Sequence, residues 1–139
     1  MANLPNVAKG LLIRRALSKA KLASKSGFHL EVIALSDSII SECINRIQFF
    51  SSEKNFTIKG IKDGCNKLKD HKVTMFDELL IAETSAWGDN RNAAIHGFTK
   101  LNEYEGASWE ERTLQVENQA GQGLTLVRRW LREAPKHKI

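Results

Sequence analysis

Arg91, Asn92 and His96 are the residues of this chain whose types and spacing best suit a chemical reaction. They lie in the segment WGDNRNAAIHGFTKLN, residues 87–102. An imidazole titrates near neutral pH, so His96 can accept or donate a proton there. A guanidinium can contact a phosphate with two hydrogen bonds and offset the negative charge of a pentavalent phosphorane. These groups suit cleavage of RNA by its own 2′-hydroxyl, which needs no metal ion and leaves a 2′,3′-cyclic phosphate and a 5′-hydroxyl.

The spacing of the three residues constrains how they can meet. Asn92 and His96 are four residues apart, so they share one face of a helix. Arg91 lies about 140° round from His96 at 3.6 residues per turn. Two arrangements bring the guanidinium to the imidazole: the long Arg91 side chain swings over from a fraying helix start, or two copies of the helix meet across a two-fold axis.

The segment resembles the R-x4-6-H signature of the HEPN superfamily, in which an Arg is followed by a polar residue and, a few positions later, by a His. The following HGF-x-x-LN, residues 96–102, is similar to HEPN toxins. The resemblance implies a homodimeric endoribonuclease with Arg91, Asn92 and His96 as its catalytic residues. It also implies a toxin–antitoxin or phage-defence setting, with an antitoxin or defence protein as partner.

Two features of the chain qualify this resemblance. HEPN toxins controlled by nucleotidyltransferase antitoxins carry a modified Tyr two residues after the His, and this chain has Phe98 there. A phenyl ring has no hydroxyl to modify, so that mode of control is in doubt. Arg132 and His137 repeat the Arg-x4-His spacing, but Pro135 lies between them and no polar uncharged residue follows the Arg.

Each residue of the motif also has a purely structural interpretation. Arg91 could form an ion pair with Glu83 or Asp89, and His96 could be a structural histidine. Glu83, which falls within an otherwise apolar stripe, is a candidate supporting group for the site. The competing hypothesis for function is a non-catalytic helical dimer that binds nucleic acid or a protein partner, and the acidic segment 77–117 around the motif favours it because it should repel RNA.

The elements that must position this motif are helices. Helical periodicity runs through the chain, and its two prolines, Pro5 and Pro135, lie near its ends. We expect helices over about 6–25, 28–50, 60–69, 75–88, 91–103 and 109–134. Ser26 is expected to cap the second, Gly88-Asp89-Asn90 to end the fourth, and Ser108 with Glu111 to begin the last. The prediction is an all-α, HEPN-like bundle of four long helices plus one or two short ones, in a single domain over residues 1–139.

Basic residues gather toward both ends of the chain, within a net charge of +5. Residues 1–27 carry six basic residues and no acidic one, and five bases fall within 128–138. Such surfaces suit the phosphates of a nucleic acid, although solvated helix faces would give the same pattern. Our candidate RNA-binding residues are Arg14, Lys100, Arg128 and Arg132.

Composition excludes several other classes. The 139 residues contain no apolar run long enough for a membrane helix, and MANLPNVAKG lacks a signal-peptide pattern. We therefore expect a cytoplasmic protein that does not bind a membrane, with Cys43 and Cys65 as reduced thiols. No C-x-x-C, H-E-x-x-H or glycine-rich phosphate-binding motif occurs, so we expect neither a metal ion nor a cofactor.

Overall fold

The regular structure is entirely α-helical in the residues that the computed structural model describes, which are 6–51, 58–70, 78–96 and 108–134. Five helices are present, and they are α1 (Asn6–Lys25), α2 (His29–Ser51), α3 (Ile61–Asp70), α4 (Glu78–His96) and α5 (Trp109–Glu133). The predicted all-α bundle is confirmed. No described helix is long and apolar enough to cross a membrane.

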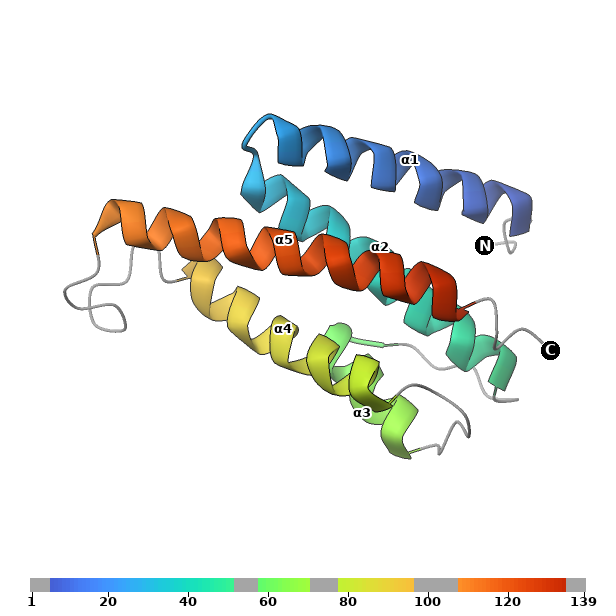
Figure 1. Ribbon diagram of the computed structural model, residues 1–139. Coiled ribbons are helices and arrows are strands. Elements are labelled where there is room, and N and C mark those ends of the chain that lie inside the picture. The colour runs from blue at the N-terminus through green and yellow to red at the C-terminus, as the bar shows by residue number, and fades with distance from the viewer. Residues whose placement is uncertain (1–5, 52–57, 71–77, 97–107, 135–139) are drawn as a thin grey trace.

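Helix α2 lies at the centre of the bundle, where it packs against α1, α3 and α5 (Figure 1). Helix α4 packs against α3 and α5. The largest fully buried side chains come from every one of these helices except α1, and they include Ile33, Ile40 and Ile44 of α2, Trp87 of α4 and Trp130 of α5. Burial of this apolar surface is the main force that holds the helices together.

The turn between α1 and α2 differs from the prediction. Gly27 adopts a positive φ of 78°, its N–H donates to the Ser24 carbonyl, and the N–H of Phe28 donates to the Ala23 carbonyl. This pair of hydrogen bonds is a Schellman motif, which closes the end of a helix. Ser26 therefore belongs to the end of α1, and its predicted role as the N-cap of the second helix is wrong.

Helix α4 continues without a break through Gly88, Asp89 and Asn90, so the predicted helix end at these residues is wrong. Gly88 is buried, and a Cβ there would lie 3.5 Å from a methyl group of Ile61 in α3, an ordinary packing distance. Asp89 forms a salt bridge with Lys62 of α3 at 3.0 Å. Contacts with α3 thus hold in helical form a segment that local sequence rules assign to a turn.

Helix α5 begins as predicted. The Ser108 hydroxyl accepts a hydrogen bond from the backbone N–H of Glu111 at 3.1 Å. The helix then runs unbroken through Gly121 and Gly123, although glycine is a weak helix former. Gly123 is buried against Trp87 and Ser36, so it permits the close approach of α5 to α2 and α4.

Candidate active site

Arg91 lies within α4 rather than in a first helical turn, and its side chain points into the bundle. Its Nη1 forms an ion pair with the carboxylate of Asp37 in α2. The guanidinium also lies 5.6 Å from the centroid of the Trp87 ring, one helical turn back. The side chain is 16% exposed, so the cation reaches solvent only at its edge.

The surroundings of Arg91 explain its electrostatics. Desolvation by the packed helices lowers the pKa of the guanidinium from its ordinary value. An arginine nevertheless stays protonated in proteins, so Arg91 is a cation that has lost most of its water. Its Nε–H makes no hydrogen bond to any described residue, while Nη1 is engaged by Asp37. Asp37 in turn accepts a hydrogen bond from Ser41 at 3.1 Å.

The pattern of burial along α4 shows how unusual this position is. Leu80, Thr84, Trp87, Gly88 and Ala94 are buried, and Arg91 falls on the face that they form. An apolar residue would be expected there, because a buried charge is costly unless it is paired. The ion pair with Asp37 offsets part of the cost of burying the Arg91 charge.

Asn92 and His96 follow Arg91 in the last part of α4. Asn92 is exposed, and His96 is the last residue of α4, its side chain lying outside the described part of the chain. Because α4 is one regular helix, the five-residue step from Arg91 to His96 turns the backbone by about 140°. One copy of α4 therefore directs Arg91 toward α2 while it leaves Asn92 in solvent.

Glu83 is not placed to support Arg91. Its carboxylate forms an ion pair with Arg129 of α5, and it lies eight residues before Arg91, about 12 Å along the helix. The ion pairs of Arg91 with Glu83 or Asp89 that the sequence allowed are both wrong, because Asp37 is the partner of Arg91 and Lys62 that of Asp89.

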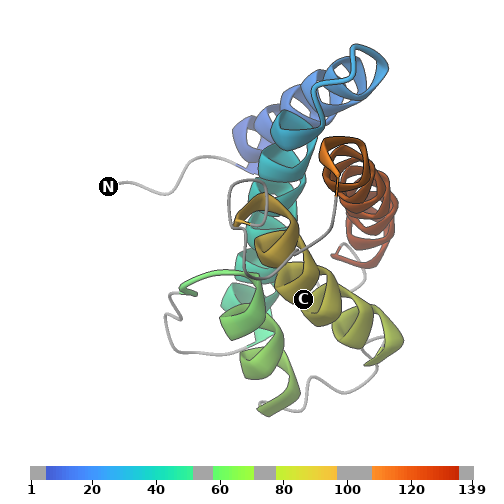
Figure 2. The ribbon, with the colours of Figure 1, turned by 90° about the vertical axis from the view of Figure 1, so that its left-hand side faces the viewer.

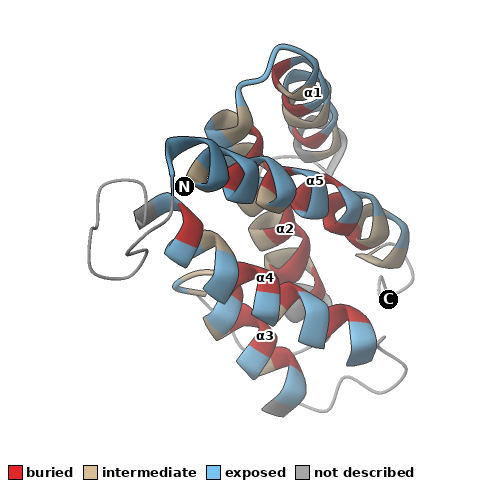
Figure 3. Ribbon diagram, turned by 60° about the vertical axis from the view of Figure 1, so that its left-hand side comes forward, coloured by how far each residue is buried: buried red, intermediate tan, exposed pale blue. Residues whose placement is uncertain are grey.

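Three of the four candidate RNA-binding residues lie on the surface, and Lys100 is outside the described residues. Arg14 of α1 and Arg128 and Arg132 of α5 are exposed. Helices α1 and α5 run antiparallel, so the C-terminal half of α5 lies beside the N-terminal half of α1 (Figure 1). The outer sides of both helices are largely exposed (Figure 3). The surface that carries these arginines and the C-terminal end of α4 lie toward opposite ends of the bundle (Figure 1).

Asp37 is a residue of the site that the sequence did not predict. The only local signal is the polar triplet Ser36-Asp37-Ser38, which lies between the apolar segments 32–35 and 39–40. Ser36 is fully buried, and its hydroxyl makes no hydrogen bond to a described residue. A polar triplet of this kind indicates contact with another polar group, but it does not identify Arg91, which lies 54 residues further along the chain.

Comparisons with known proteins add no assignment, since no protein-family model, no curated protein and no solved structure matches the chain. Within the described ranges, no group of three or more His, Cys, Asp or Glu side chains could hold a metal ion.

Proposed function

We propose that this protein is a metal-independent endoribonuclease of the HEPN type that acts as a homodimer. In this proposal His96 accepts the proton of the attacking 2′-hydroxyl and donates a proton to the leaving 5′-oxygen. Arg91 stabilises the phosphorane, and Asn92 orients the phosphate or the imidazole. A toxin or phage-defence setting, with an antitoxin or defence partner, follows from the resemblance of the motif alone.

The observation that carries the proposal is the desolvated guanidinium of Arg91. A buried ion pair is weak evidence for a stabilising role, because desolvation offsets most of its Coulomb energy. Perturbed charged groups gather at functional sites, where charge in a low-dielectric setting acts strongly on a reacting group. The Nε of Arg91 is buried, so the donors that a phosphate could reach lie on the exposed 16% of the side chain.

The geometry favours a site shared between two copies of the chain. Arg91 and His96 are about 140° apart on a continuous helix, and α4 does not fray at Arg91. The α1–α2 turn, the end of α4 and the start of α5 lie at one end of the bundle, on the left in Figure 1 and toward the viewer in Figure 2. Large apolar side chains are exposed on these segments, namely Phe28 at 61%, Ile95 at 36% and Trp109 at 65%. Such exposed groups suit a protein interface beside His96.

A non-catalytic helical dimer that binds nucleic acid or a protein is the second candidate. The observation that favours it is the same ion pair, because Asp37 already engages the guanidinium within the bundle. In this alternative Arg91 only joins α2 to α4. The exposed Arg14, Arg128 and Arg132 would then account for any affinity for RNA.

Cleavage of single-stranded RNA in the presence of EDTA separates the two candidates. The proposal predicts products that end in a 2′,3′-cyclic phosphate, identified by mass spectrometry. His96→Ala should slow cleavage by about 100-fold or more, the range that general acid–base catalysis contributes. His137→Ala is the matched control, because it alters the second Arg-x4-His spacing, and it should cleave at the wild-type rate. If folded His96→Ala cleaves as fast as that control, the proposed catalytic role of His96 is wrong. If RNA is bound in a salt-sensitive manner but never cut, the non-catalytic candidate is correct.

A further inference from the structure

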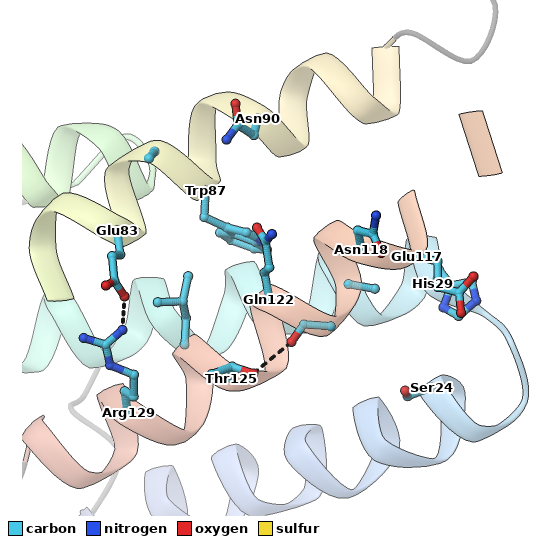
Figure 4. Close-up of a pocket in the computed structure, with 14 residues that line it drawn as sticks. Ser24, His29, Glu83, Trp87, Asn90, Glu117, Asn118, Gln122, Thr125 and Arg129 are labelled. Atoms are coloured by element: carbon cyan, nitrogen blue, oxygen red, sulfur yellow. Dashed lines mark hydrogen bonds and ion pairs between the residues drawn. The ribbon is translucent and has the colours of Figure 1, made fainter. Parts of the chain in front are cut away.

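A groove of about 830 Å³ runs between α4 and α5 and reaches the α1–α2 turn (Figure 4). We call it the α4–α5 groove. Its size lies in the range of small-molecule sites in proteins. The residues of α4 that line it are Glu83, Ala86, Trp87 and Asn90, which recur at intervals of three and four and so share one face. The other lining residues are Ser24, His29, Glu117, Asn118, Ala120, Gly121, Gln122, Thr125, Leu126 and Arg129.

Small residues keep the groove open. Ala86 faces it from α4, and Ala120 and Gly121 face it from α5. A Cβ built at Gly121 would have no other heavy atom within 4 Å, so the space beside this glycine is empty of side chains. Trp87 closes the inner wall, since it is only 2% exposed and its indole N–H donates to the Gln119 carbonyl at 2.8 Å.

The lining is rich in carboxamides from both helices. Asn90 projects from α4, and Asn118 and Gln122 project from α5, one turn apart (Figure 4). Of the two carboxylates, Glu83 is neutralised by Arg129 at one end of the groove, and Glu117 lies toward the other end. Carboxamides and a carboxylate can form hydrogen bonds with the edge of a planar heterocycle, whereas carboxylates disfavour a phosphate in the same space.

We infer that the α4–α5 groove binds one unpaired RNA base that carries an exocyclic amine, such as cytosine, next to the cleaved bond. The inference rests on the proposed ribonuclease function. Proteins read single-stranded RNA by hydrogen bonds to the exposed edges of unstacked bases. Glutamate accepts a hydrogen bond from the cytosine amine, and uracil presents an acceptor at the same ring position. The Arg91 guanidinium lies 5.6 Å from the centroid of the Trp87 ring, which forms the inner wall of the groove, so the base bound in the groove belongs to a nucleotide near the phosphate that Arg91 contacts.

Nucleosides test the groove without any cleavage reaction, because they contain no phosphodiester bond. We expect cytidine, added up to roughly 10 mM, to shift the NMR signals of the Asn90, Asn118 and Gln122 side-chain amides in the full-length protein. Uridine should bind about fivefold more weakly or worse, given the usual discrimination of one hydrogen-bonded base edge. His96→Ala should bind cytidine as the wild type does.

Two pairs of variants locate the binding. Gly121→Leu should fill the groove and abolish the shifts, and Gly10→Leu is its control, because Gly10 is also helical with open space around it but lies in α1 outside the groove. Glu117→Gln should reduce the preference for cytidine over uridine, whereas Glu110→Gln, the same change on α5 outside the groove lining, should preserve it.

The outcomes separate this inference from the proposed function. RNA cleavage without any cytidine binding would overturn the groove assignment alone, as would equal binding of the two nucleosides or cytidine binding that survives Gly121→Leu. Shifts of the three amides by a protein partner and by neither nucleoside would also overturn it. Cytidine binding by a protein that cuts no RNA would instead overturn the ribonuclease proposal.

Discussion

Arg91 of α4 pairs with Asp37 of α2, and this ion pair links the motif-bearing helix to the centre of the bundle. The two residues are 54 positions apart in the chain, and the Arg91 side chain is more deeply buried than that of Asp37, at 16% against 30% exposed. The guanidinium also lies over the ring of Trp87, which is one helical turn earlier in α4. The site that we propose therefore depends on how α2 and α4 are placed relative to each other as well as on the motif itself.

Asp37→Asn should destabilise the fold, because it leaves a desolvated cation without its counter-charge. Both side chains remain partly exposed, so we expect a loss of about 1–3 kcal/mol, less than for a sealed pair. Urea denaturation followed by circular dichroism measures this loss. The double variant Arg91→Met/Asp37→Leu should regain most of it, since apolar residues often replace a buried pair at little cost. An Asp37→Asn protein as stable as the wild type would show that the pair is not maintained in solution.

Two glycines of α5, two residues apart, should respond in opposite ways to alanine. Gly121→Ala meets nothing within 4 Å and should stabilise the protein by up to about 1 kcal/mol, the difference in helix propensity. A Cβ at Gly123 would lie 2.7 Å from Cζ2 of Trp87 and 3.2 Å from Ser36. Gly123→Ala should therefore destabilise by about 1–3 kcal/mol, as overpacking does. Thermal unfolding of the two variants checks the prediction, and equal melting temperatures would contradict the close approach of α5 to α4.

Ile95→Glu should separate the proposed dimer. Ile95 is exposed on the last turn of α4, next to His96, and a carboxylate there would oppose burial in an interface. Sedimentation equilibrium should find a dimer for the wild type and a monomer for this variant, with a parallel loss of RNA cleavage. Leu12→Glu is the control, because Leu12 is 55% exposed on α1, and it should remain a dimer. A monomeric variant with full cleavage would show that one copy is sufficient.

The buried thiol of Cys43 should make stability depend on alkaline pH. Burial raises the pKa of this thiol from 9.0 to about 12, so above pH 9 the unfolded chain releases a proton that the folded chain retains. The contribution is fully present below pH 9 and is lost as the pH rises toward 12, at roughly 1.4 kcal/mol per pH unit. The difference in free energy of unfolding between the wild type and Cys43→Ala should therefore change in the alanine variant's favour by about that amount between pH 9.5 and 10.5. A constant difference would mean that the Cys43 thiol ionises equally well in the folded protein.

The sequence predicted helices more reliably than the faces that they bury. The helical period of residues 28–50 places Val32, Ile33, Ile40 and Ile44 on one arc, and all four are buried because α2 is covered by neighbours over much of its surface. The helical period of residues 75–88 likewise places Leu79 on an apolar stripe, but Leu79 is 61% exposed. Near the end of a helix, a side chain is buried only if a neighbouring helix extends far enough to cover it. The helical period of one segment does not show how far its neighbours extend.

The failures at the candidate site share one physical cause, which is tertiary contact. Gly88 would favour a helix end in isolation, but α3 packs against it and α4 continues. The partner of Arg91 is Asp37 in α2, and the spacing of residues within the motif does not show which other helix lies against it. Local rules therefore found the motif and its helical setting, whereas its electrostatic partner required the three-dimensional structure.

A catalytic role for Arg91 is tested most directly by the rate of RNA cleavage by the Arg91→Met/Asp37→Leu protein. This variant removes the cation and its counter-charge together, so its fold and stability are expected to resemble the wild type. Our account predicts cleavage slower by about 100-fold or more, in line with the loss of a transition-state charge contact. A folded double variant that cleaves RNA within about twofold of the wild-type rate would contradict a role for Arg91 in the reaction.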